Sequence, residues 1–207
     1  MRGVFLFLFA SVLSVNMHGQ KGTMTDWRDP TEYKTVKIGE QKWMAENLAY
    51  NDPKNQSDCY RDSISNCIKY GRLYTWEVAN KVCPRGWRLP TKSEFESLLS
   101  YAGGRDRKKA FKILTADSIL GFNALLGGYY YSYYSTPTIL HTTDYLREED
   151  GVTAFWTSTE EYYSGMGAIS HNEKPMADIV FFGPKGTLVF MDVFYKKCAM
   201  SVRCIED

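Results

Sequence analysis

YTWEVANKVCPRGWRLPTKSEFESLL, residues 74–99, is the stretch from which the organisation of the chain can be worked out. Its second half predicts a helix with a clear start, because Thr91 and Glu94 have the Thr-x-x-Glu spacing of a capping box. Apolar residues then recur at the spacing that places them on one face of a helix, namely Phe95, Leu98 and Leu99. Before the turn that contains Cys83, the less regular apolar pattern of residues 76–82 predicts a first, shorter helix.

Strands are predicted before and after these two helices. Residues 33–44 alternate in polarity on either side of Gly39, which indicates a β-hairpin with its turn at that glycine. Residues 121–134, which end in a run of tyrosines, predict a strand that enters a loop. The remaining predicted strands are residues 155–159, 177–182, 187–193 and 200–205. With a third helix at residues 105–114, and with no repeat or linker, these elements predict one domain of the α+β class.

Two segments between these elements have weaker patterns. Residues 20–30 are polar and indicate a flexible leader or a short edge strand. Residues 51–66 are rich in turn-forming residues and predict a loop that holds Cys59 and extends to Cys67. A disulfide between these two cysteines would replace the core that such a loop lacks.

The N-terminus has the pattern of a secretory signal peptide. One arginine precedes a mostly apolar run from Val4 to Val15, and this run is too short to cross a bilayer, for which about 20 residues are needed. We therefore expect a signal peptide over residues 1–20, cleaved between residues 14 and 20, and a mature domain over residues 21–207. The expected location is secreted, periplasmic or bacterial cell-surface, with no membrane insertion after cleavage.

The overall charge of the chain is close to neutral. The net charge is +1 at pH 7, with 25 basic and 24 acidic residues that are interspersed, so neither nucleic acid nor an anionic membrane is an expected partner. The basic run at residues 105–109 is the exception. It has the composition of a phosphate-binding patch, but we favour its interpretation as the solvated face of the third helix.

Five cysteines in an exported chain indicate two disulfides and one remaining thiol. Cys59 and Cys67 are close enough in sequence to close a local loop. Cys83 paired with Cys204 would tie the helices to the C-terminal strand and leave Cys198. Because Cys198 and Cys204 would lie on the same face of an uninterrupted strand, the pairing of Cys83 with Cys198 remains an alternative.

Several blocks of the sequence together resemble the Fibrobacter succinogenes major paralogous domain. In order along the chain, they are TEYKTVKIGEQKWMAENLAY, CYRDSISNCIKYGRLYTW, CPRGWRLPT, GFNALLGGYY, FWTSTE and SVRCIED. The resemblance implies a C-type-lectin-like fold, with a helical pair packed on twisted antiparallel sheets and distant similarity to formylglycine-generating-enzyme domains. It also implies the disulfides Cys83–Cys204 and Cys59–Cys67, and a place in secreted or surface proteins of bacteria. It implies no general biochemical activity.

The patterns that would indicate catalysis or metal binding are incomplete. His141 and His171 are isolated from other ligand residues, so they predict no zinc site. The Glu-Pro-Asn or Gln-Pro-Asp loop of calcium-dependent sugar binding is missing from the sequence. Copper-dependent oxidation would need two nearby thiols, for which Cys198 and Cys204 are the nearest candidates. We therefore expect no catalytic residue, no metal and no cofactor.

Aromatic residues gather between residues 129 and 163. Only one side of a tyrosine-rich strand can face a core, so some of these rings should be exposed, where they can stack on sugars or pack on a protein. The expected binding residues are Tyr130, Tyr133, Tyr134, Trp156, Tyr162 and Tyr163. The sequence thus predicts a non-catalytic module for an unknown glycan or surface protein. The alternatives are an enzyme of the oxidase branch of the fold and a purely structural surface protein.

Overall fold

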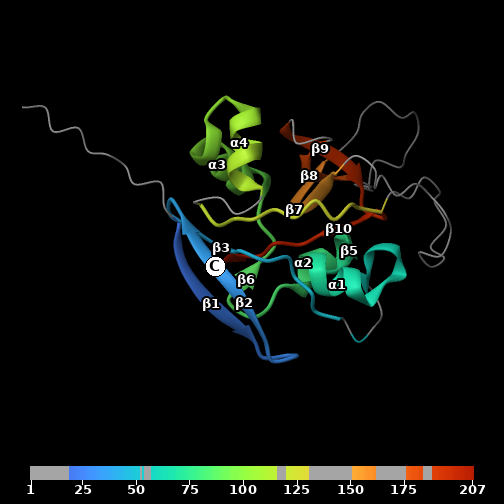
Figure 1. The fold of residues 1–207 in the computed structure, drawn as a ribbon. Helices are drawn as coiled ribbons and strands as arrows, with labels where there is room; N and C mark the ends of the chain where they lie inside the picture. The colour runs from blue at the N-terminus through green and yellow to red at the C-terminus, as the bar shows by residue number, and fades with distance from the viewer. Residues whose placement is uncertain are drawn as a thin grey trace, which may run out of the picture.

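The structure, a computed structural model, describes residues 19–51, 53, 57–115, 120–130, 151–161, 176–183 and 188–207. Two sheets form its framework (Figure 1). The five-stranded sheet has the order β1 (Gln20–Asp26), β2 (Thr31–Ile38), β3 (Gln41–Met44), β11 (Ile205–Glu206) and β6 (Trp87–Arg88). The six-stranded sheet has the order β4 (Ser57–Asp58), β5 (Leu73–Thr75), β10 (Ala199–Ser201), β7 (Thr153–Glu161), β8 (Met176–Phe182) and β9 (Val189–Tyr195). Among the described strands, the β10–β7 pair alone is parallel.

Four α-helices and one 3₁₀ helix accompany these sheets in the described part of the chain. They are η1 (Tyr60–Asp62), α1 (Ile64–Tyr70), α2 (Trp76–Val82), α3 (Lys92–Gly103) and α4 (Arg107–Leu114). Helices α3 and α4 cover one side of the six-stranded sheet, and α2 lies on the other (Figure 1). The mixed composition confirms the predicted α+β class, and the predicted helices at 76–82 and 105–114 are present.

The capping box predicted at the start of α3 is present. The backbone N–H of Glu94 donates to Thr91 Oγ1 over 3.3 Å, and the backbone N–H of Thr91 donates to Glu94 Oε2 over 2.8 Å. Arg88 forms an ion pair with the same carboxylate over 2.6 Å. This ion pair, together with the Thr91 hydrogen bonds, lowers the pKa of Glu94 from its ordinary value of 4.5.

Replacing Glu94 with glutamine should therefore lower the free energy of unfolding by about 1 kcal/mol at pH 7. A carboxyl whose folded-state pKa is lowered contributes stability above its unfolded pKa, and this contribution is lost as the pH falls through the folded value. The difference between the wild type and the variant should thus shrink as the pH falls below the ordinary carboxyl pKa, and disappear only below the lowered pKa of folded Glu94. Urea denaturation at pH 7 and pH 3 measures this, with the exposed Glu96→Gln in the same helix as control. Equal stabilities of wild type and Glu94→Gln at pH 7 would contradict it.

The N-terminal strands agree in part with the sequence predictions. Of the two structures considered for residues 20–30, the edge strand is present, since β1 pairs along β2 at the border of its sheet. The β2–β3 hairpin turns at Gly39, whose φ of +60° suits glycine. The predicted loop at 51–66 is wrong in its second half, where β4, η1 and the first turn of α1 lie. Residues 1–18, which hold most of the predicted signal peptide, lie outside the described residues.

Two strand predictions are corrected by the structure. Residues 121–130 form no strand but only single bridges at Ala124, Gly128 and Tyr130, and residues 131–134 lie outside the described part. Residues 200–205 are not one strand, because the chain leaves the six-stranded sheet after Ser201 and joins the five-stranded sheet at Ile205. The residues between these two strands form backbone hydrogen bonds as well. The Val202 carbonyl accepts from the Leu48 N–H over 2.9 Å, and the Cys204 carbonyl accepts from the Met44 N–H over 3.0 Å.

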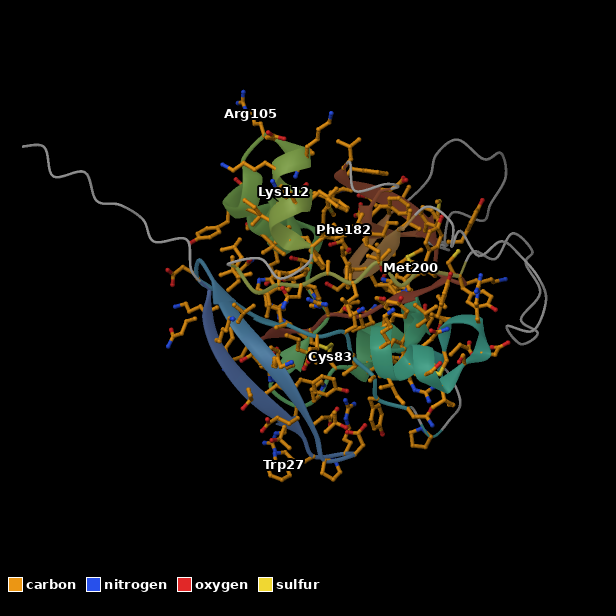
Figure 2. The ribbon with its side chains drawn as sticks, in the orientation of Figure 1. Trp27, Cys83, Arg105, Lys112, Phe182 and Met200 are labelled. Carbon is orange, nitrogen blue, oxygen red and sulfur yellow. A yellow bond between two sulfur atoms is a disulfide. The ribbon has the colours of Figure 1, made fainter. Side chains whose placement is uncertain are left out.

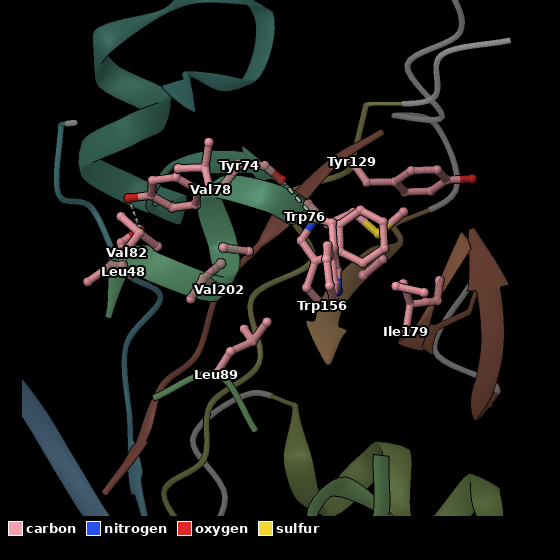
Figure 3. Close-up of a cluster of buried hydrophobic side chains, with 14 of the residues drawn as sticks. Leu48, Tyr74, Trp76, Val78, Val82, Leu89, Tyr129, Trp156, Ile179 and Val202 are labelled. Carbon is pink, nitrogen blue, oxygen red and sulfur yellow. Dashed lines mark hydrogen bonds between the residues drawn. The ribbon is translucent and has the colours of Figure 1, made fainter. Parts of the chain in front are cut away.

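The core lies on both faces of the six-stranded sheet. Trp156 of β7 and Ile179 of β8 enter a cluster with α2, which Figure 3 shows. Their neighbours Phe155 and Val180 point the other way, into a cluster with α3 and α4. Both parities of these central strands are therefore buried, as is typical of a sheet covered on two sides.

Candidate functional site

The candidate site is built around the segment closed by the Cys59–Cys67 disulfide. The bond joins the residue before η1 to the middle of α1, with Cα atoms 4.9 Å apart. Inside the loop, the Asn66 side chain donates to the carbonyl of Tyr60 over 2.9 Å. The ring of Tyr60 is buried and meets Tyr70 edge to face, with centroids 6.4 Å apart.

A glycine pair passes directly over these two rings. A Cβ atom on Gly127 would lie 2.8 Å from the Tyr70 side chain, and one on Gly128 would overlap the ring of Tyr60. Gly128 also has a φ of +80°, which side-chain-bearing residues rarely adopt. The pair therefore allows the chain to lie flat against the disulfide-closed segment.

Tyr130 follows this glycine pair and is fixed by its backbone. Its N–H donates to the carbonyl of Ala199 over 2.8 Å, and its carbonyl accepts from the Ala199 N–H over 3.1 Å. Its half-buried side chain packs against a small cluster with Tyr60 and Leu73. Burial raises the pKa of Tyr130, and the nearby carboxylates of Asp62 and, more weakly, Asp58 add to this rise.

We call this surface the Tyr130 platform and define it by Tyr60, Tyr70, Tyr130, Arg61 and Asp62. Arg61 and Asp62 are exposed, and the guanidinium of Arg61 lies 5.9 Å from the Tyr60 ring centroid. The platform therefore combines a partly exposed aromatic ring with one cationic and one anionic group. Such a set can stack on the apolar face of a sugar or on an apolar side chain and form polar contacts at the rim.

The six predicted binding residues have different outcomes. Tyr130 is partly exposed, and its role in binding stays a prediction. Trp156 does not, because its side chain is 0 % exposed and its indole N–H donates to the Tyr74 carbonyl over 2.8 Å (Figure 3), so its assignment to a binding surface is wrong. The other four lie outside the described residues and remain predictions: Tyr133, Tyr134, Tyr162 and Tyr163.

Sequence reasoning missed a polar cluster at the start of α3. Lys92 Nζ lies 2.9 Å from Asp178 Oδ1 and 3.4 Å from Glu161 Oε1. The Asp178 side chain is 1 % exposed, and burial raises its pKa, whereas its hydrogen bond raises the pKa of Lys92. The cluster attaches α3 to β7 and β8. The aspartate within the apolar run MADIVFF was the sequence signal that could have revealed it.

The cysteines are arranged as the resemblance implied. Cys83 bonds Cys204, with Cα atoms 5.9 Å apart, and the alternative pairing of Cys83 with Cys198 is not formed. Cys198 is buried and lies outside both disulfides. Because Cys204 is bonded to Cys83, Cys198 and Cys204 cannot supply a pair of thiolates to a copper ion.

Metal ligands do not gather in the described residues, where no group of three or more His, Cys, Asp and Glu side chains is close enough to hold an ion. Both candidate histidines, His141 and His171, lie outside those residues. In the described part, no helix combines the length and apolar character needed to cross a bilayer.

The fold and the site together define a disulfide-bonded α+β module with an aromatic surface. Comparison with family models is more specific, since the model described as the Fibrobacter succinogenes major domain matches residues 36–206. The chain therefore belongs to this family. Searches of curated proteins and of solved structures gave no significant match.

Proposed function

We propose that this chain is a non-catalytic extracellular module that binds a glycan or protein ligand at the Tyr130 platform and the adjoining aromatic segments. The observation that carries the proposal is the fixed position of a partly exposed Tyr130 on a disulfide-closed base. A ring that is already ordered loses little conformational entropy on binding, so it can contribute more of its contact energy to affinity.

An extracellular or periplasmic location is supported by the covalent structure. Two disulfides use four of the five cysteines, and such bonds persist in oxidising compartments. The apolar N-terminal run also supports this location, because it has the pattern of a secretory signal peptide. Location at the cell surface or in the periplasm would place the module where glycans and surface proteins are available.

The enzyme alternative has less support. Oxidation of the kind carried out by formylglycine-generating enzymes needs a thiol pair, and the nearest candidate pair here is divided because Cys204 is bonded to Cys83. The Lys92–Asp178 ion pair is the other polar cluster of interest, and its geometry serves to position α3. A binding role therefore accounts for more of the observed features.

The test is a glycan array and a surface-protein pull-down with the purified chain, followed by calorimetry on the ligand found. Tyr130→Ala should weaken binding at least about tenfold, because truncating an aromatic contact at the centre of an interface commonly costs more than 1.4 kcal/mol. Tyr101→Ala on α3 is the matched control, since Tyr101 is an exposed tyrosine on a different element and should bind as the wild type does.

The predicted tyrosines outside the described residues are tested by two further variants. Tyr133→Ala/Tyr134→Ala and Tyr162→Ala/Tyr163→Ala should each weaken the same ligand if the platform continues into these segments. Unchanged affinity in the Tyr130→Ala protein would reject the platform. The absence of any ligand for the wild type would instead favour the purely structural role.

A further inference from the structure

The surface of α4 carries an organised row of positive charge. Three lysines of α4, Lys108, Lys109 and Lys112, lie on its exposed side, and Arg105 stands two residues before its first residue. We call this row the basic stripe: Arg105, Lys108, Lys109 and Lys112. All four residues are exposed. Arg105 lies at the outer end of the α3–α4 pair (Figure 2). The opposite face of α4, with Ala110, Phe111 and Leu114, is buried in the core.

The charges of the basic stripe are not neutralised within the described residues. None of its four side chains forms an ion pair there with a carboxylate, whereas many other lysines and arginines of the chain do. The neighbouring acid, Asp106, is the N-cap of α4 and accepts from the N–H groups of Lys108 and Lys109, each over 3.0 Å. Asp106 offsets one of the four positive charges of the stripe, so an excess of positive charge remains.

This arrangement works against the stability of the helix that carries it. Lys108 and Lys109 lie in the first turn together with Arg107, and that turn contains no acidic residue. Cations at a helix N-terminus oppose the macrodipole, and like charges at i, i+4, such as Lys108 and Lys112, repel each other. A bound polyanion would remove both unfavourable interactions.

We propose that the basic stripe binds an acidic polysaccharide, whose carboxylate or sulfate groups recur along an extended chain. The stripe extends from residue 105 to residue 112, and seven residue steps correspond to about 10 Å along a helix axis, so it can meet successive anionic groups of one strand. A membrane surface fits less well, because the apolar face of α4 is buried in the core and is not available for insertion. Nucleic acid fits less well because the aromatic residue of α4, Phe111, is buried and cannot stack on bases.

The basic stripe lies on a different element from the Tyr130 platform, so its proposal stands or fails independently of the proposed function. The platform is formed by η1, α1 and the segment before residue 131, whereas the stripe belongs to α4 (Figure 1). The roles of the platform and the stripe can be distinguished by testing variants of each against the same probe.

The experiment measures binding of the full chain to polygalacturonate by calorimetry at low ionic strength, with neutral dextran as the reference polymer. Lys108→Gln/Lys109→Gln/Lys112→Gln should reduce the affinity at least about tenfold and flatten its dependence on salt. The matched control is Lys21→Gln/Lys37→Gln/Lys81→Gln, which changes the net charge equally at exposed lysines of other elements and should bind nearly as the wild type does.

Folding of the stripe variant is checked by circular dichroism and thermal melting. Its melting temperature should be equal to or above that of the wild type, because the substitutions remove repulsion within α4. Equal losses of affinity in the two triple variants would overturn the proposal, since binding would then follow net charge alone. Failure of the wild type to bind polygalacturonate would overturn it as well, whether or not anionic vesicles or DNA are bound.

Discussion

Replacing Arg203 with methionine is expected to lower the free energy of unfolding by about 3 kcal/mol, one of the two largest effects that we predict. Arg203 is fully buried, and its guanidinium donates to the Phe122 carbonyl, to the Asn47 side chain and, over 3.3 Å, to the Asn123 carbonyl. Methionine fills similar space but leaves these three buried acceptors without their donor. Each such loss costs about 1–3 kcal/mol, which the removal of a buried charge partly offsets.

The surroundings of Arg203 explain why a charged side chain is tolerated there. Its guanidinium carbon lies 4.5 Å from the Phe122 ring centroid and 5.4 Å from that of Phe155, distances at which aromatic faces attract a cation. Burial lowers the pKa of Arg203 to about 9, so the group is still charged at pH 7. It therefore acts as a cross-link between β7, the segment around residue 122 and the chain after β3.

Chemical denaturation at pH 7 measures this effect. Arg72→Met is the matched control, because Arg72 is only half-buried and donates to a single residue, to the Ser57 carbonyl over 3.4 Å and to its hydroxyl over 3.3 Å. We expect the control to lose at most about 1 kcal/mol. If both variants lost the same amount, Arg203 would not have the cross-linking role assigned to it.

Removing the Cys83–Cys204 disulfide should lower the free energy of unfolding by about 5 kcal/mol. The bond spans 121 residues. In the chain-entropy model, the entropy that a disulfide removes from the unfolded chain rises with the logarithm of the loop length. The Cys59–Cys67 bond spans only 8 residues, so its removal should cost about half as much, close to 2.5 kcal/mol.

The comparison uses two double variants, Cys83→Ala/Cys204→Ala and Cys59→Ala/Cys67→Ala, each unfolded in guanidinium chloride. The first should have the lower midpoint. Each double variant is the control for the other, because both lose two sulfur atoms and one covalent bond. A larger loss from the short loop would contradict the entropic explanation and would indicate that Cys59–Cys67 holds native contacts directly.

Local patterns were the part of the fold that the sequence could predict. The Thr91–Glu94 box, the Gly39 turn and the helix at 76–82 all depend on residues that are neighbours along the chain, and the structure contains each of them. The α+β class followed from the same patterns. The disulfide pairing needed the family resemblance, because spacing alone left two partners for Cys83.

Features set by distant contacts could not be predicted in this way. Trp156 was assigned to a surface because aromatic residues gather between residues 129 and 163, but β7 lies between two layers that bury both of its faces. Arg203 gave no signal, because arginine is rarely fully buried and its three acceptors come from distant residues. In the candidate site, Tyr130 was found from the tyrosine run, but its base around Tyr60 depends on a glycine contact visible only in the fold.

The path of residues 199–206 has a consequence for the timing of folding. These residues supply β10 in the interior of one sheet and β11 in the interior of the other. Without this segment, β5 would have no neighbour toward β7 and β3 none toward β6, so we expect both sheets to be completed in one late, cooperative step of folding.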